Sequence, residues 1–413
     1  MEYKKTKITI FLLALTIAGL GWFFIFSQKN IIKIESSNIN GIIATTTVNG
    51  IVVPIIKKNT DIEPQKQLSN PPQIIKATYM TSWSAGTESR IQYFLDLVKV
   101  TEINAVVIDI KDYSGLVAYD INLPEIERYK AKEIRIKNIN SLIKRLHDEN
   151  IYVIARATVF QDPILAKARP DLAVKRKLTT TSSTDQYPTW YDKKGLAWTD
   201  PSSKEVWDYN IAIAKDAANR GFDEINFDYI RFPSDGDTSS MYFSFWDKKY
   251  PKTEILKNFY SYLRESLSGI KISADIFGLV AIQTGDIGVG QILENVYESF
   301  DFVCPMVYPS HYYSGTLGYK NPADHPYEIV KYSIDKAIAR LITLEKSTDL
   351  SSATSTKINS KLRPWLQDFD LGADYTPEMV KAQIQATSDS LGDKYSGYMM
   401  WNPSNVYTKT ALQ

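Results

Sequence analysis

Cysteine and histidine are scarce in this sequence, and their scarcity excludes several kinds of site. The 413 residues include one cysteine, Cys304, and three histidines. A single cysteine cannot build an internal disulfide framework or a cysteine-rich zinc site. Three histidines leave little basis for a histidine-based metal centre. We therefore predict no cofactor and no metal, and look to other residue types for the chemistry.

An excess of charge of one sign is also absent. The chain has 48 basic and 47 acidic residues, which gives a formal net charge of +1. Binding of nucleic acid needs a concentrated basic face, so we predict no nucleic-acid partner. Aromatic residues, in contrast, are plentiful, with 8 Trp, 26 Tyr and 16 Phe. Most aromatic side chains belong to cores, but a surplus of Trp and Tyr also suits a site that stacks on sugar rings.

Long apolar runs are rare, and the longest one stands at the N-terminus. Ile8 to Phe26 contains no charged residue, and its length is close to the roughly 20 residues of a membrane-spanning helix. Lysines precede the run, which favours a cytoplasmic N-terminus. A cleaved signal peptide is the alternative, although its apolar core is usually only about 7–15 residues long. We predict a single-pass membrane anchor over residues 1–27, with the rest of the chain extracytoplasmic.

The remaining chain changes character near residue 76. Residues 28–75 are rich in Ile, Asn, Thr, Lys and Pro, which is typical of a linker. Eight short apolar runs follow, and near-continuous runs are expected for parallel strands that are covered on both faces. The runs are ATYMTSW (77–83), NAVVIDI (104–110), IYVIARA (151–157), DEINFDYI (223–230), KISADIF (271–277), DFVCPMVY (301–308), LRPWLQ (362–367) and SGYMMW (396–401).

Segments with a helical period separate several of these runs, for example residues 88–102, 134–150 and 203–221. The alternation predicts a (β/α)₈ barrel, the TIM-barrel class, over residues 76–413. A doubly wound open sheet is the alternative, but no glycine-rich phosphate loop follows the first strand. Residues 345–361 are of low complexity, and we expect a flexible loop there.

Polar and aromatic residues end nearly all eight runs. Active sites of such barrels lie at the carboxyl ends of the strands, so these side chains are expected to converge on one mouth. Any single one of them is also compatible with a structural ion pair. In chain order they are Trp83, Asp109, Asp112, Arg156, Asp228, Arg231, Asp275, Tyr308, His311, Gln367, Asp368, Trp401 and Asn402.

Carboxylates combined with Trp and Tyr are typical of a glycoside hydrolase, which needs two carboxyl groups beside the scissile bond. Asp228 and Asp275 end adjacent predicted strands, and we predict that they are the catalytic pair. Asp228 would stay ionised beside Arg231 or Arg156, while an apolar setting would raise the pKa of Asp275, as a general acid requires. The reverse assignment of roles stays open. We predict that the other strand-end residues bind a polysaccharide or oligosaccharide substrate.

Several long motifs carry a resemblance to a known family. AVVIDIKDYSGLVAYD (105–120), GFDEINFDYIRFPSDG (221–236) and LRPWLQDF (362–369) are among them. Over about Ala77 to Tyr407 the chain resembles a bacterial family of glycoside hydrolase-like domains, first catalogued as a domain of unknown function. The resemblance implies a TIM-barrel, glycosidase-like domain on an envelope protein.

A weaker likeness links DEINFDYI to the fourth strand of chitinase-type hydrolases, D-G-x-D-x-D-x-E. Asp223 and Asp228 match that pattern, but Asn226 replaces one Asp and Ile230 replaces the catalytic Glu. The missing Glu argues against a substrate-assisted mechanism of the chitinase type. Asp275 is then the nearest candidate for the acid.

Two alternatives to a two-carboxylate glycosidase remain. The first is a barrel that binds glycan in the cell envelope without cleaving it. The second is a metal-dependent hydrolase in which Asp109, Asp112, Asp228 and Asp275 would hold Mg²⁺ or Ca²⁺, since hard cations prefer oxygen ligands.

Overall fold

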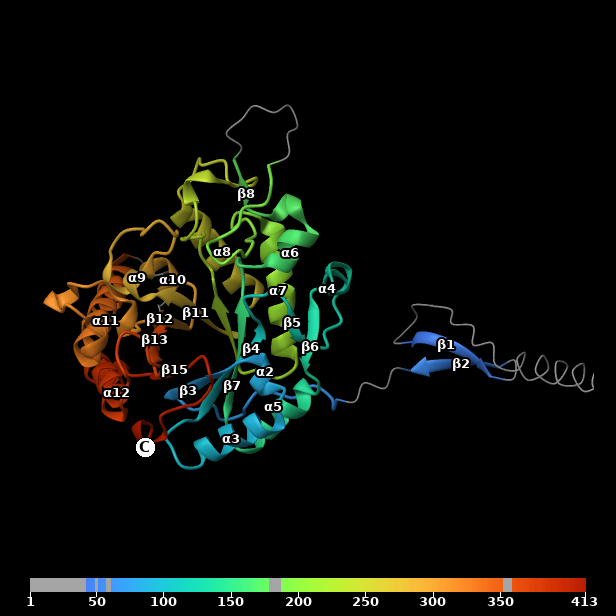
Figure 1. Ribbon diagram of the computed structural model, residues 1–413, viewed down its shortest axis with the longest axis horizontal. Helices are drawn as coiled ribbons and strands as arrows, with labels where there is room; N and C mark the ends of the chain where they lie inside the picture. Colours follow the sequence, from blue (N-terminus) through green and yellow to red (C-terminus); the bar gives the residue numbers. More distant parts are fainter. Residues whose placement is uncertain (1–41, 49–50, 57–60, 178–186, 352–358) are drawn as a thin grey trace, which may run out of the picture. The chain divides into compact units, whose positions relative to one another are not determined.

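The computed structural model describes residues 42–48, 51–56, 61–177, 187–351 and 359–413 (Figure 1). The chain divides into two units, residues 1–60 and residues 61–413. In the first unit, β1 (Ile42–Val48) and β2 (Ile51–Ile56) pair as an antiparallel hairpin. None of the helices within the described ranges has the length and apolar character to cross a membrane. The predicted anchor, residues 1–27, lies outside the described residues.

The second unit is a closed barrel of eight parallel strands, with β15 pairing β3 to complete the ring. All eight strand runs and the predicted α/β barrel are confirmed. The strands in barrel order are β3 (Ile75–Met80), β4 (Ala105–Lys111), β7 (Tyr152–Thr158), β9 (Glu224–Asp228), β11 (Lys271–Phe277), β12 (Phe302–Met306), β14 (Trp365–Gln367) and β15 (Gly397–Trp401). The short β13 (Lys361–Leu362) pairs with β12 just before β14.

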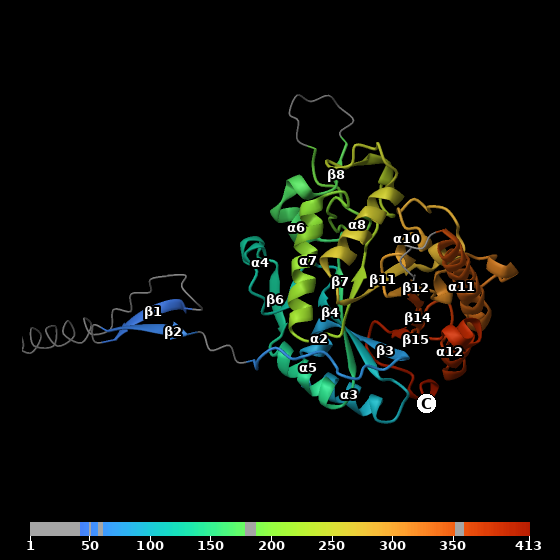
Figure 2. The same ribbon diagram turned by 180° about the vertical axis from the view of Figure 1, so that it is seen from behind.

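Helices surround the barrel and bury their apolar faces against the outside of the strands (Figures 1 and 2). The longer ones are α3 (Glu88–Val98), α5 (Ile139–Asp148), α7 (Lys204–Asn219), α8 (Lys252–Ser266), α11 (Pro326–Ser351) and α12 (Pro377–Leu391). Shorter helices are α2 (Ser82–Ala85), α4 (Pro124–Tyr129), α6 (Pro163–Ala168), α9 (Gly278–Ile282) and α10 (Leu293–Tyr297).

Three local expectations need correction. The helix expected over 134–150 begins only at Ile139, because Lys132–Ile136 forms β6, which pairs with β5 (Val117–Tyr119) beside β4. Tertiary pairing with β5 outweighs the helical period of that segment. Helix α11 continues to Ser351, into the stretch expected to be a loop. Trp83 lies in α2, because β3 ends at Met80.

Residues 61–74, which composition assigned to the linker, lie against the barrel. The Asp61 carboxylate accepts hydrogen bonds from the backbone N–H groups of Asn140 (2.7 Å) and Ser141 (2.9 Å) at the start of α5. Leu68 N–H donates to Asp223 Oδ1 at 2.7 Å, just ahead of β9. A carboxylate at a helix N-terminus is favourable because the first amides lack partners there. Composition alone could not reveal these contacts.

The barrel interior is apolar over much of its length and polar at both ends. A core cluster separate from the outer one includes Ala77, Val107, Ile154 and Cys304, which point inward from four strands. Side chains alternate between the two faces of a strand, so every second residue points inward. On β9 the inward residues are Glu224, Asn226 and Asp228, which bond to Arg363, Asp275 and Arg156, respectively. The polar groups at the carboxyl end of the strands form the candidate site.

Candidate active site

One guanidinium group holds three carboxyl groups at the carboxyl ends of the strands. Arg156, on β7, donates from Nη1 to Asp109 Oδ1 at 2.5 Å and from Nη2 to Asp228 Oδ2. Its Nε lies 3.6 Å from Asp275 Oδ2. The four side chains come from four consecutive barrel strands, β4, β7, β9 and β11. All four are buried, so their charges interact with little screening by water.

Asp275 is the carboxyl group with the most perturbed environment. It is 2% exposed, and its Oδ1 accepts hydrogen bonds from Trp365 Nε1 (2.7 Å) and Asn226 Nδ2 (2.9 Å). Burial and the neighbouring charge of Asp228 raise the pKa of Asp275 to about 8, against the opposing effect of Arg156. This shift favours the protonated form of Asp275. The other oxygen, Oδ2, faces Arg156 Nε at 3.6 Å.

Asp228 ends β9 at a sharp turn of the backbone. Its Oδ1 accepts the backbone N–H of Tyr229 at 2.6 Å, and Tyr229 has a φ of +53°. A left-handed conformation is unfavourable for an aromatic residue, and such strain is found where a site dictates the backbone. The Tyr229 carbonyl in turn accepts the N–H of Phe160 at 3.3 Å. The turn fixes the Asp228 carboxylate at the edge of the barrel mouth.

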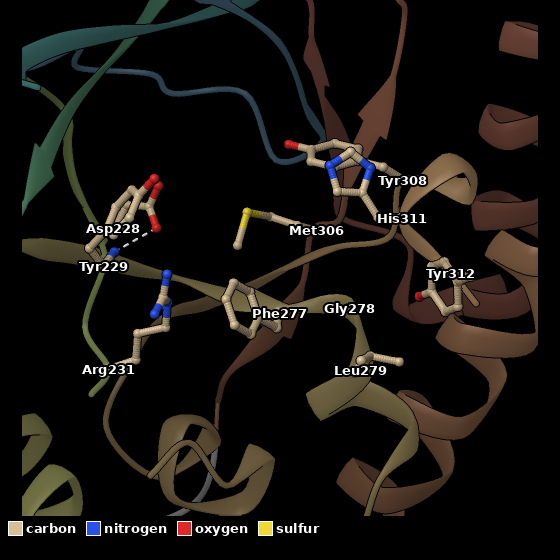
Figure 3. A pocket seen from close by; sticks show the side chains of 10 residues that line it. All are labelled: Asp228, Tyr229, Arg231, Phe277, Gly278, Leu279, Met306, Tyr308, His311 and Tyr312. Atoms are coloured by element: carbon tan, nitrogen blue, oxygen red, sulfur yellow. Dashed lines mark hydrogen bonds between the residues drawn. The ribbon is translucent and has the colours of Figure 1, made fainter. Parts of the chain in front are cut away.

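A cavity of about 310 Å³ opens beside Asp228 (Figure 3). Its other walls are mainly aromatic or apolar. The lining residues are Asp228, Tyr229, Arg231, Phe277, Gly278, Leu279, Met306, Tyr308, His311 and Tyr312. Gly278 has to be glycine, because a Cβ there would lie 2.5 Å from the Met306 carbonyl oxygen and 2.7 Å from the Tyr312 hydroxyl. Asp275 does not line this cavity.

The structure decides between Arg156 and Arg231, the two arginines that the sequence offered as partners of Asp228. The interpretation that Arg231 keeps Asp228 charged is wrong, because Arg156 forms the ion pair. Arg231 donates from Nη1 to the Phe232 carbonyl at 3.1 Å and to Ser234 Oγ at 3.2 Å. Only two residues separate Asp228 from Arg231 in sequence, but the turn at Tyr229 directs the arginine along the cavity wall instead.

Three other predicted residues lie at the same mouth. Tyr308 is buried and lines the cavity, and His311 lies at its exposed rim. Trp401 stacks on Tyr79 with ring centroids 4.0 Å apart. The Arg156 guanidinium lies over both of these rings, 5.7 Å from the Trp401 centroid and 5.8 Å from that of Tyr79. Trp401 thus helps to hold Arg156 in place.

Three further predicted residues serve the structure near the mouth. Gln367 is fully buried, and its Oε1 accepts the Ser310 hydroxyl at 2.8 Å, which anchors the segment that carries His311. Asp368 accepts the backbone N–H (2.8 Å) and hydroxyl (2.6 Å) of Thr408. Asn402 donates to the Asp368 carbonyl. The hydrogen bonds of Asp368 therefore anchor the C-terminal segment at Thr408.

Asp112 and Trp83 lie outside the carboxylate cluster. Asp112 forms an ion pair with Arg135 and accepts the Ser114 hydroxyl at 2.5 Å. Trp83 is 60% exposed, and the Arg135 guanidinium lies 4.8 Å from its ring centroid. The geometry does not bring these two residues to the cavity.

Residues that were not among the predicted site residues complete the cluster. The Tyr79 hydroxyl donates to Asp109 Oδ2, while Asn226 and Trp365 donate to Asp275. Phe277 and Met306 form cavity walls. Alternate residues of a strand share a face. Asn226, two residues before Asp228, and Phe277, two residues after Asp275, could therefore have been predicted from the sequence.

The metal-dependent alternative does not match this arrangement. Within the described ranges, no group of three or more His, Cys, Asp or Glu side chains is placed to hold a metal ion. Of the four aspartates considered, Asp112 lies elsewhere, and the space between the other three is occupied by the Arg156 guanidinium.

A family model described as "Putative glycosyl hydrolase domain" matches residues 77–407. The chain belongs to this family. Membership confirms the resemblance carried by the sequence motifs and supports a glycosidase-like function. The matched range includes every residue of the carboxylate cluster and of the cavity. No curated protein matches the chain.

Several solved structures resemble this chain. The glycoside hydrolase domain of PgaB (BpsB) from Bordetella bronchiseptica is 15% identical, with a TM-score of 0.52, and the match covers 82% of this chain and 99% of that one. At this identity the likeness shows the barrel fold. A hypothetical protein from Ruminiclostridium thermocellum is 42% identical over 48% of this chain and 96% of its own, with a TM-score of 0.43. An α-galactosidase from Thermus thermophilus is 11% identical over 84% of this chain and 61% of its own, with a TM-score of 0.48.

Proposed function

We propose that the barrel hydrolyses glycosidic bonds of a cell-surface or extracellular polysaccharide, with Asp228 and Asp275 as its two carboxyl groups. One observation carries the proposal: Asp228 lines an aromatic-walled cavity, and Arg156 links it to Asp275, a buried carboxyl group whose pKa is raised. Glycosidases need one carboxyl group that donates a proton and one that is ionised. Two carboxyl groups with environments that separate their pKa values can divide these roles.

The roles follow from the hydrogen bonds of each group. Asp275 is the acid, and its proton would pass to the oxygen of the leaving sugar as the glycosidic bond breaks, while water supplies the hydroxyl group that ends on the anomeric carbon. Asp228 accepts N–H donors on both oxygens and serves as the carboxylate at the sugar ring. Arg156 contacts both groups and offsets the negative charge that Asp275 acquires when it gives up the proton. Aromatic walls such as Phe277 and Tyr308 suit the face of a sugar ring.

Release of reducing ends from a panel of polysaccharides tests this function. The panel includes peptidoglycan, α-glucans and β-glucans, and the full-length protein is compared with Asp228→Asn. We expect release by the wild-type protein and a loss of about 10³-fold or more in Asp228→Asn, because the substitution removes the charge but hardly changes the shape. Equal release by both proteins would exclude Asp228 from the chemistry. The melting temperature of each protein controls for folding.

A barrel that binds glycan without cleaving it is the second candidate. The observation that favours it is the position of Asp275, which is 2% exposed and does not line the cavity. In that case the cluster would serve only to hold Asp228 and the aromatic walls in place. Retention of the protein by a polysaccharide, with no release of reducing ends over long incubation, would support this function.

Location remains a proposal from the sequence. We propose that residues 1–27 anchor the protein in the cell membrane and that the barrel lies on the extracytoplasmic side. The charge-free run from Ile8 to Phe26 supports the proposal. Protease treatment of intact cells is the test: the barrel should be digested, while a cytoplasmic marker protein survives.

A further inference from the structure

The cavity wall contains a buried arginine that forms no ion pair. Arg231 is 8% exposed and lines the cavity next to Asp228 (Figure 3). No carboxylate oxygen of the described residues lies within 4.0 Å of its guanidinium nitrogens. Its hydrogen bonds to Phe232 and Ser234 both come from Nη1. The Nε and Nη2 groups make no hydrogen bond to a described residue.

The other arginines inside this barrel are all matched with carboxylates. Arg156 serves three aspartates, and Arg363 binds both oxygens of Glu224. A buried charge without a partner costs several kcal/mol, so such a group is seldom kept for stability alone. Burial indeed lowers the pKa of Arg231. Arginine nevertheless remains protonated at any physiological pH.

Aromatic rings hold the Arg231 guanidinium without neutralising it. Its Cζ atom lies 4.4 Å from the ring centroid of Phe277, 4.9 Å from that of Trp198 and 5.2 Å from that of Tyr229. Contacts of this kind offset part of the cost of desolvation. They also fix the plane of the guanidinium, whose unused donors then match two oxygens of an anion. The rings therefore present a preorganised cation to the cavity.

We propose that Arg231 binds an anionic substituent of the glycan, so that the substrate is an acidic polysaccharide that carries carboxylate or sulfate groups. This inference rests on the proposed function and names the substrate class of the same cavity. The apolar walls at Met306, Leu279 and Tyr308 would contact the sugar ring, and Arg231 would fix its orientation through the anion.

Affinity electrophoresis of the full-length protein tests the inference without requiring hydrolysis. The gels contain polygalacturonate, its carboxyl-reduced neutral form, dextran sulfate or dextran. We expect the wild-type protein to bind one of the anionic polymers at least about tenfold more tightly than its neutral counterpart. The formal net charge of +1 gives little non-specific attraction to either anionic polymer. Tighter binding of polygalacturonate than of its carboxyl-reduced form indicates that the site binds a carboxylate. Tighter binding of dextran sulfate than of dextran indicates that it binds a sulfate.

Variants decide whether Arg231 causes the preference. Arg231→Met should bind the anionic and neutral polymers equally, and Arg231→Lys should keep only part of the preference, because an ammonium group lacks the fork of donors. Arg128→Gln removes the same charge from an exposed position on α4 and should behave as the wild type. If Arg231→Met does not fold, Arg231→Lys is the deciding variant.

The inference and the proposed function fail in different ways. A wild-type protein that binds neutral and anionic polymers equally, or an anionic preference that is undiminished in Arg231→Met and Arg231→Lys, overturns the inference. Neither result affects a glycosidase that acts on neutral sugars. Conversely, an Arg231-dependent preference with no release of reducing ends supports the inference and points to a binding barrel.

Discussion

The interior of this barrel holds two buried ionic groups, one at each end of β9. At the carboxyl end, Asp109, Asp228 and Asp275 share the guanidinium of Arg156. At the amino end, Glu224 alone pairs with Arg363, and neither side chain is exposed at all. The two groups are four residues apart along one strand, which is about 13 Å. Both groups consist of an arginine and carboxylates, but the arginine at the mouth serves three carboxylates and the arginine at the amino end serves one.

Stoichiometry determines what each group can do. The Glu224–Arg363 pair is neutral, because one forked cation meets both oxygens of one anion, and Tyr152 adds a hydrogen bond at 3.3 Å. At the mouth, one cation cannot neutralise three carboxylates, so burial leaves Asp275 with its proton. A matched buried pair is a structural element, whereas an unmatched cluster beside a cavity keeps a proton available for chemistry.

The largest expected effect comes from breaking the matched pair. Glu224→Gln leaves the Arg363 charge buried without an anion, and we expect a loss of about 3–5 kcal/mol in the free energy of unfolding. Urea unfolding measures it. Replacing both partners, with Glu224→Leu and Arg363→Met, should cost less because no unpaired charge remains. A fall in activity without a fall in stability would contradict the structural role of this pair.

Replacing Arg156 or Arg363 by lysine tests the difference between the mouth and the amino end of the barrel. Arg156→Lys keeps the charge but cannot serve three carboxylates in their present positions, so kcat should fall about 10–100-fold. Arg363→Lys should lower the melting temperature while the kcat of the folded protein stays near that of the wild type. Rates and melting curves are measured on the same samples. An equal fall in kcat in Arg363→Lys and Arg156→Lys would contradict the assignment of a structural role to Arg363 and a catalytic-site role to Arg156.

The pH dependence should report only the cluster at the mouth. The pKa of Asp275 is raised to about 8, so the acid form is lost as the pH rises through that value. We expect kcat/KM to fall roughly tenfold per pH unit above it. In Asp275→Asn, the residual kcat/KM should not show this fall at high pH.

The same proton affects stability. Between about pH 4 and pH 8 the folded protein keeps a proton on Asp275 that the unfolded chain has lost. The free energy of unfolding contributed by this group therefore falls as the pH rises across that window. Asp275→Asn should flatten the dependence of the melting temperature on pH. An unchanged dependence would place the raised pKa on another group.

The smallest effect is expected from the tyrosine hydroxyls that support each cluster. Tyr79→Phe removes the hydrogen bond to Asp109 and should cost about 0.5–1.5 kcal/mol of stability, with a fall of a few-fold in kcat. Tyr152→Phe removes the longer hydrogen bond to Glu224 and should leave kcat unchanged. Steady-state rates on the same polysaccharide separate the two variants. Equal falls in kcat would mean that the mouth and the amino end are not independent.

Local sequence patterns were enough to predict most of the fold. The eight apolar runs and their polar ends identified the strands, because a covered parallel strand has to be apolar on both faces. Propensity failed at Lys132–Ile136, where pairing with β5 outweighs the helical period. It also missed the contacts of residues 61–74, which depend on where the chain passes the barrel.

The sequence by itself determined that Asp109, Arg156, Asp228 and Asp275 gather at the mouth, because strand position and alternation place them on the inner face of one barrel end. Only the tertiary structure decided how their charges are shared. Arg156 reaches three carboxyl groups from neighbouring strands, and the turn at Tyr229 separates Arg231 from Asp228. Burial and electrostatic energy depend on distances between strands, and a linear sequence does not contain those distances.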